Sequence, residues 1–132
     1  MLRGITADGK VLGDVIGNAV SSASLPIVVV AFVVAALVRI SVGSATVAMT
    51  MAAGIIAAMP EIATLSPLYL ACVTAAVAGG ATVCSHFNDS GFWLVKSLVG
   101  LDEKTTLKTW TIMETLVGGT GFVVALIISF FA

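Results

Sequence analysis

The sequence has few charged side chains. Asp, Glu, Lys and Arg make up 10% of its 132 residues, whereas about 25% is usual in soluble domains. Hydrophobic residues make up 59% of the chain, and the mean hydropathy is +1.16. This composition excludes an ordinary soluble domain and predicts an integral membrane protein. The formal net charge of −1 provides no basic surface, so we exclude nucleic acid as a partner.

Cysteine and histidine are also scarce. The two cysteines, Cys72 and Cys84, lie in apolar surroundings and lack the CxxC or Cys/His spacing of zinc and redox sites. We interpret both as small buried hydrophobic residues, and we expect neither a metal site nor a cofactor. The stretch from Met1 to Asn18 mixes polar and apolar residues and does not resemble a secretory signal. The first apolar segment is therefore expected to direct membrane insertion.

Long uncharged segments predict an all-α membrane fold. One spanning helix needs about 20 residues to cross a hydrocarbon core about 30 Å thick, so the chain can hold about four or five membrane elements. We expect a single transmembrane unit over residues 1–132. Its predicted elements are a span over 24–40, a hairpin or span over 41–60, one half of a broken helix over 65–84, a break over 85–91, a short half-helix over 92–100 and a span over 111–132.

Several residues are expected to mark the ends of these elements. Ser24 is a candidate cap for the first span, and Pro26 suits its first turn. Arg39 closes that apolar run. It is either an anchor at the membrane interface, which we favour, or a clamp for a carboxylate. Thr111 and Glu114 have the spacing of a capping box at the start of the last span.

The segment over 41–60 is rich in small residues and has two interpretations. Composition alone favours a spanning helix whose small side chains allow neighbouring helices to approach closely. The alternative is a re-entrant hairpin, in which the residues from Gly43 to Thr46 form a turn. The free amides and hydroxyls of that turn would then face a solute.

The polar nonamer from Ser85 to Trp93 is the most informative stretch, because it lies between apolar segments. Irregular polar backbone is tolerated at bilayer depth only where it is buried in protein or lines a watery cavity. A broken helix also presents an amino terminus, which favours an anion. Asp89 either caps the short half-helix or carries a proton. His86 can relay a proton or hold a hydrogen bond, and Asn88 can read a hydroxyl.

Several strings together resemble the carboxy-terminal part of the gluconate permease family. They run from Ser85 to Leu94, from Leu107 to Thr111 and over Glu114-Thr115, and are joined by Arg39-Ile40 and the string from Gly43 to Ala48. Their order and spacing are similar to those of the family. The resemblance covers roughly Pro26 to the end of the chain. One departure is Ser90, where relatives often carry proline.

The resemblance implies proton-coupled symport of gluconate or a related sugar acid in the bacterial inner membrane by a multi-pass protein. It also implies a distant link to the ion-transporter superfamily, whose members have two inverted repeats, and it raises the hairpin interpretation above the plain span. The implied substrate-binding residues are Gly43, Ser44, Thr46, Ser85, His86, Asn88 and Asp89. Asp89 and His86 are the candidates for proton coupling.

Length affects which partners we expect. Members of the family are several times longer, so the chain resembles one half of such a carrier, completed by an amino-terminal half or a second copy. The other expected partners are a sugar-acid anion and the lipid bilayer. A noncatalytic membrane subunit or helix-packing module is the alternative. An intramembrane hydrolase using Ser85, His86 and Asp89 is disfavoured, because catalytic groups normally converge from separate elements and no oxyanion hole is recognisable. We therefore expect no enzyme activity.

Overall fold

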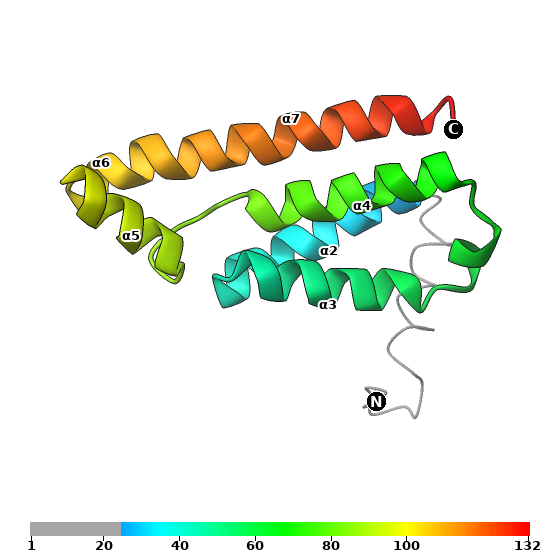
Figure 1. Ribbon diagram of the computed structural model, residues 1–132, viewed down its shortest axis with the longest axis horizontal. Coiled ribbons are helices and arrows are strands. Elements are labelled where there is room, and N and C mark those ends of the chain that lie inside the picture. The colour runs from blue at the N-terminus through cyan, green and yellow to red at the C-terminus, as the bar shows by residue number, and fades with distance from the viewer. Residues whose placement is uncertain (1–24) are drawn as a thin grey trace.

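The computed structural model describes residues 25–132, and this part of the chain is all-α (Figure 1). Ser24 and the stretch from Met1 to Asn18 lie outside the described residues. The elements are α2 (Ile27–Val42), α3 (Ala45–Ala57), the 3-10 helix η1 (Pro60–Thr64), α4 (Pro67–Thr82), α5 (Ser90–Val99), α6 (Glu103–Thr106), the π-helical turn η2 (Leu107–Thr111) and α7 (Ile112–Ser129). The all-α expectation is confirmed for this part of the chain.

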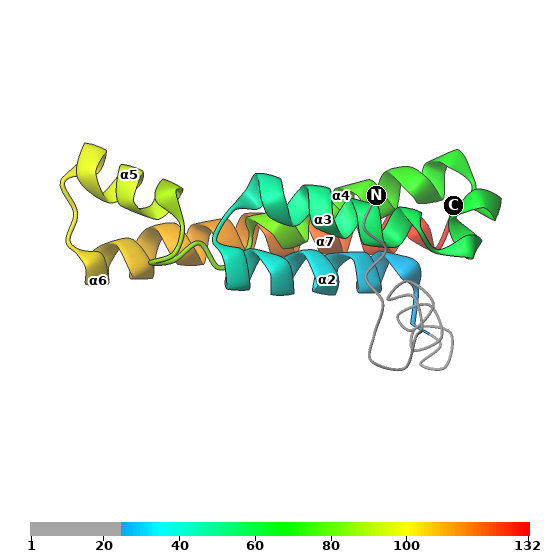
Figure 2. The ribbon, with the colours of Figure 1, turned by 90° about the horizontal axis from the view of Figure 1, so that it is seen from below.

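The helices α2 and α3 form an antiparallel hairpin closed by a tight turn, as both side views show (Figures 1 and 2). Gly43 ends α2 with a left-handed φ of 75°, and its amide donates to the Arg39 carbonyl over 2.8 Å. Ser44 then caps α3 by accepting from the Val47 amide over 3.4 Å. The turn lies at the end of the bundle where α4 also ends.

Glycine lets α4 approach two of its neighbours, α2 and α7, closely. A Cβ atom added to Gly80 would lie 2.3 Å from the Phe32 carbonyl oxygen of α2, and one added to Gly79 would lie 2.7 Å from the Gly118 carbonyl oxygen of α7. The Phe32 and Phe122 rings stack beside these contacts, with centroids 4.2 Å apart. The small residues of these helices therefore do pack helix against helix, as membrane helices commonly do.

The buried core is built mainly from small and β-branched residues of α2, α3 and α4. It includes Val28, Ala31, Ala35, Ala52, Ile56, Cys72, Val73, Ala76 and Val77. Cys72 is buried, which confirms its interpretation as a small hydrophobic residue. Cys84 is only half-buried, so the same interpretation is wrong for Cys84, which lies in the irregular backbone after α4.

The chain leaves helical geometry after Thr82 and resumes it at Ser90, so α4 and α5 are separated by a break over residues 83–89. Asp89 caps α5 by accepting from the Gly91 amide over 2.9 Å, which confirms the capping role. At the far end of α5 the chain turns through Gly100. Lys96 and Glu103 form an ion pair of 2.8 Å across that corner.

The last helix is longer than the sequence suggests. Asp102 caps it by accepting from the Thr105 amide over 2.7 Å, and hydrogen bonds from Thr105 lower the pKa of Asp102 below its usual value. The helix therefore begins at Glu103, whereas the sequence-based boundary lies near Thr111. The capping-box interpretation of Thr111 and Glu114 is wrong, because Thr111 has helical φ and ψ and makes no capping bond.

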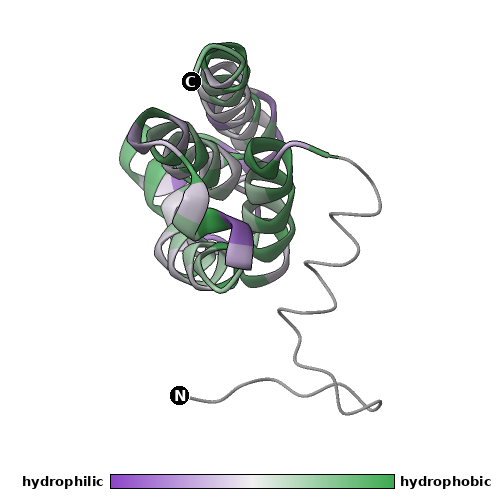
Figure 3. Ribbon diagram, turned by 90° about the vertical axis from the view of Figure 1, so that its right-hand side faces the viewer, coloured by the Kyte–Doolittle hydropathy of each residue, from purple (hydrophilic) through white to green (hydrophobic). Residues whose placement is uncertain are grey.

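The helix Glu103–Ser129 is 27 residues long and, among the described residues, is the one helix long and apolar enough to cross a membrane. Figure 3 shows how little hydrophilic colour the bundle carries outside its loops. On α7 large apolar side chains point outward, among them Leu116 at 64% exposure and Val117 at 61%. A lipid environment accounts for this surface, since soluble proteins rarely expose large contiguous apolar areas.

Candidate functional site

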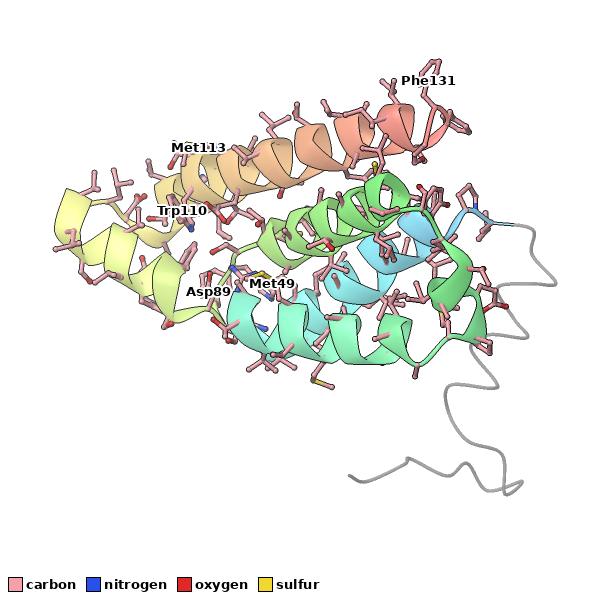
Figure 4. The ribbon with its side chains drawn as sticks, turned by 45° about the vertical axis from the view of Figure 1, so that its right-hand side comes forward. Met49, Asp89, Trp110, Met113 and Phe131 are labelled. Carbon is pink, nitrogen blue, oxygen red and sulfur yellow. The ribbon has the colours of Figure 1, made fainter. Side chains whose placement is uncertain are left out.

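The turn between α2 and α3 meets the break between α4 and α5. A Cβ atom added to Gly43 would lie 2.2 Å from the carbonyl oxygen of Asn88, so the two backbones approach as closely as glycine allows. The side-chain Nδ2 of Asn88 donates to the Ile40 carbonyl over 2.8 Å. Figure 4 shows Asp89 at this end of the bundle, beside the α2–α3 turn. The α2–α3 turn and the α4–α5 break, which are about 40 residues apart in the sequence, thus form one site.

A buried ion pair joins these two parts of the chain. The Arg39 Nη2 lies 2.5 Å from Asp89 Oδ2, and its Nη1 donates to the Gly43 carbonyl over 2.6 Å. Arg39 is 3% exposed and Asp89 is 7% exposed. The sequence favours an interfacial anchor for Arg39, and this interpretation is wrong for the described structure, because the guanidinium points inward to a carboxylate. The clamp interpretation is the one that the geometry supports.

Asp89 accepts hydrogen bonds from several directions. Its Oδ1 takes the Gly91 amide, and its Oδ2 takes both Arg39 and the hydroxyl of Ser85. An ionised carboxylate suits this position, since it accepts on both oxygens and lies at the positive, amino-terminal end of α5. The carboxylate therefore connects α2, the break and α5.

Ser85 connects the break to the last helix. It is fully buried, and its Oγ accepts from Trp110 Nε1 over 2.9 Å. Its carbonyl accepts from the Thr111 hydroxyl, and the neighbouring Cys84 amide donates to Thr115 Oγ1 over 3.1 Å. Trp110 and Thr111 belong to the π-helical turn η2, a type of irregularity that often marks functional sites.

The backbone of the break is strained at Cys84. This residue has a φ of 57°, in the left-handed region that non-glycine residues rarely occupy. Its carbonyl lies 2.7 Å from His86 Nδ1, so Nδ1 donates to the carbonyl oxygen. Strained backbone of this kind tends to cluster at functional sites.

Not all of the sequence-predicted residues meet at one point. Gly43, Ser85, Asn88 and Asp89 contact one another or Arg39, whereas His86 is held by the Cys84 carbonyl. Ser44 caps α3 and Thr46 lies on its first turn, and none of the described hydrogen bonds joins their side chains to the break. The predicted substrate-binding set omits Arg39, which the sequence offers as a carboxylate clamp only beside the favoured anchor. It also omits Trp110, Thr111 and Thr115, whose local sequence does not reveal such distant partners.

Two apolar grooves lie away from this polar cluster. One, of about 200 Å³, is formed by α4 and α7, and the other, of about 350 Å³, is formed by α3, η1 and α4. Their lining residues do not include the polar residues described above. Among residues 25–132, no three His, Cys, Asp or Glu side chains are grouped to hold a metal ion.

A family model described as "GntP family permease" matches residues 4–131. The chain is 44% identical over 116 residues to the low-affinity gluconate transporter of Escherichia coli K12, which covers 88% of this chain and 26% of that protein. It is 40% identical over 118 residues to the gluconate permease of Pseudomonas aeruginosa (89% and 26%) and 36% identical over 118 residues to the Gnt-II system L-idonate transporter of E. coli K12 (89% and 26%). The chain thus spans about a quarter of the length of these curated relatives. No solved structure matches it.

Proposed function

Because the chain belongs to the GntP permease family, we propose that it forms part of a proton-coupled membrane carrier for gluconate or a related sugar acid. Membership of this permease family also means that the chain is not an enzyme. The relatives named for gluconate and for L-idonate suggest a sugar-acid anion as the solute. The proposed location is the bacterial inner membrane, which the chain crosses several times.

The observation that carries this proposal is the convergence of the α2–α3 turn and the α4–α5 break on the buried Arg39–Asp89 pair. The amino termini of α3 and α5 both begin in this region, and their free amides favour the carboxylate of a sugar acid. In this proposal Ser44, Thr46 and Asn88 bind the solute's hydroxyls, with Gly43 and Ser85 shaping the site. Either Asp89 or His86 carries the coupling proton.

The proposed architecture is part of one half of an inverted-repeat carrier, because the chain spans about a quarter of the length of its relatives. The α2–α3 hairpin is the re-entrant element, and α4 and α5 are the two halves of a broken helix. The 13 residues of α3 give a length of about 20 Å, well short of a hydrocarbon core of about 30 Å. The rest of a longer permease, or further copies of the chain, complete the path for the solute.

Gluconate uptake tests the proposal. The chain alone, and a version extended upstream, are expressed in cells without their own gluconate permeases, and uptake is followed with and without a pH gradient. Uptake by the chain alone means that quarter-length units assemble into a carrier. Uptake by the extended form alone makes the chain one part of a longer permease. Absence of gluconate uptake by both contradicts the proposal.

A helix-packing module is the second candidate, and the contacts of Gly79 with Gly118 and of Gly80 with Phe32 favour it. Cysteine labelling separates the two. In a Cys72→Ala/Cys84→Ser background, Asn88→Cys should react with a membrane-impermeant thiol reagent and be protected by gluconate if Asn88 binds the solute. Val117→Cys, at an outward position of α7, is the matched control and should resist that reagent. Equal labelling with and without gluconate favours the packing module.

A further inference from the structure

We propose that Arg39 binds the carboxylate of the solute. The solute and Asp89 pair with the Arg39 guanidinium in turn, and Asp89 leaves it as the protonated acid. This inference rests on the proposed function and adds a binding residue and a coupling step to it. The starting point is the chemistry of the guanidinium, which holds five N–H donors in a rigid fork.

Arg39 has an unused donor in a buried place. One Nη1 hydrogen goes to the Gly43 carbonyl and one Nη2 hydrogen goes to Asp89, while the buried Nε has no partner. Among the described residues, Nε of Arg39 is the one buried side-chain nitrogen or oxygen left without a hydrogen bond. An unsatisfied buried donor costs about 1–3 kcal/mol, and more when it is charged. The structure therefore lacks an acceptor beside Arg39.

The missing acceptor is best supplied by a carboxylate. Nε and Nη2 form one side of the guanidinium, and a carboxylate pairs with that side through two parallel hydrogen bonds. Asp89 now reaches this side through a single oxygen and only at Nη2, because its other oxygen is held by Gly91. A sugar acid that binds Nε and Nη2 together displaces Asp89 and makes one more hydrogen bond than Asp89 makes.

Charge balance links this exchange to a proton. Arg39 and Asp89 are neutral as a pair, so a solute anion that joins them leaves a net negative charge in a buried site. Uptake of one proton by Asp89 removes that charge: the carboxylate of Asp89 becomes a carboxylic acid, and the solute carboxylate becomes the counter-ion of Arg39. The anion and the proton then enter together in equal numbers.

Few other charges are available to replace Asp89 in this role. The helices α3 and α4, which pack around the site, contain no charged residue. Glu114 of α7 is close enough for the charges of Arg39 and Asp89 to act on it, and His86 lies on the break itself. Neither is hydrogen-bonded to Arg39 in the described structure, so Asp89 is the group whose protonation releases the guanidinium.

Calorimetry of gluconate binding to the purified chain and to its upstream-extended form tests the exchange. Titration in two buffers of different ionisation enthalpy gives the protons taken up per anion, and we expect about one. Asp89→Asn imitates the protonated acid, so it should bind gluconate without proton uptake and with an affinity independent of pH. Proton uptake that persists in Asp89→Asn overturns the assignment to Asp89. Glu114→Gln is the control and should keep proton uptake.

The double variant Arg39→Gln/Asp89→Asn tests Arg39 without leaving an unpaired buried charge. Relative to Asp89→Asn alone it should bind gluconate roughly ten- to a hundredfold more weakly, since charged hydrogen bonds are lost. Equal affinity of the two variants overturns the role of Arg39. A neutral polyol of the same length should not bind with proton uptake. If the wild-type protein neither binds nor transports gluconate in either length, the proposed function itself fails. Gluconate binding that is unchanged by both substitutions contradicts only this inference.

Discussion

At the scale of single residues, the pairing of Arg39 with Asp89 decides how the site responds to substitution. Both side chains are almost completely buried, so each compensates the charge of the other. Removing one member of a buried pair costs about 3–5 kcal/mol because it leaves an uncompensated buried charge, a cost that does not arise when both charges are removed together. The pair is thus a constraint on the fold as well as a candidate binding site.

We expect Arg39→Gln and Asp89→Asn each to lower the thermal stability of the detergent-solubilised protein markedly, and the double variant to recover much of the loss. Differential scanning fluorimetry measures this. Lys96→Gln, which breaks the exposed pair with Glu103, is the control and should shift the midpoint little, because exposed pairs contribute about 0–1 kcal/mol. If the loss of thermal stability in the double variant equals the sum of the losses in the two single variants, the pairing is contradicted.

Gly43 permits a second comparison at this scale. Gly43→Ala should destabilise the protein strongly, since the new Cβ would lie 2.2 Å from Asn88 O and φ is 75°. Gly100 has nearly the same φ, 74°, but open space around it, so Gly100→Ala should cost only the backbone strain of about 1–2 kcal/mol. Chemical denaturation in mixed micelles compares the two. Equal losses of stability in the two variants would mean that the contact between Gly43 and the α4–α5 break does not contribute to stability.

At the scale of helices, α4 is central because it contacts α2 and α7 through glycines. The backbones approach at Gly79 and Gly118 without side chains between them. Such contacts are common between membrane helices, where close van der Waals packing replaces the hydrophobic effect. The glycines of these helices do not all have this role.

Gly79→Ala should therefore separate α4 from α7 and lower stability, because its Cβ would lie 2.7 Å from the Gly118 carbonyl oxygen. Gly54 of α3 has nothing within 4 Å, so Gly54→Ala should raise helix stability by about 0.5–1 kcal/mol. Thermal unfolding followed by circular dichroism distinguishes the two. A stabilising Gly79→Ala would show that the close contact is absent in the membrane.

At the scale of the whole molecule, the outward apolar surface and the family assignment both indicate a membrane protein. Val117→Lys tests the lipid-facing surface, since a lysine near the middle of a membrane helix costs about 2.5–3.5 kcal/mol. We expect this variant to be extracted by alkaline carbonate to a greater extent than the wild type. Thr109→Lys, near the charged end of the same helix, is the matched control and should stay in the membrane fraction.

Local signals predict much of the fold, and long-range contacts account for what they miss. The cap at Asp89 is recognisable from neighbouring residues alone, whereas composition favours a continuous span through Gly43 and only the family resemblance indicates a turn there. The pairing of Arg39 with Asp89 spans 50 residues, and that of Ser85 with Trp110 spans 25, so no local pattern reveals either. Thr111 misled the sequence interpretation because a capping-box pattern has the same spacing inside a helix that has already begun at Glu103.

The ion pair also sets an order of events during synthesis. Arg39 is made 50 residues before Asp89, and at about 5–20 residues per second this interval lasts roughly 2–10 seconds. During that time the nascent chain holds a cation whose counter-ion does not yet exist. The guanidinium of Arg39 therefore reaches its buried counter-ion only after translation has passed the break, whereas the hydrogen bonds that close the α2–α3 turn are all local.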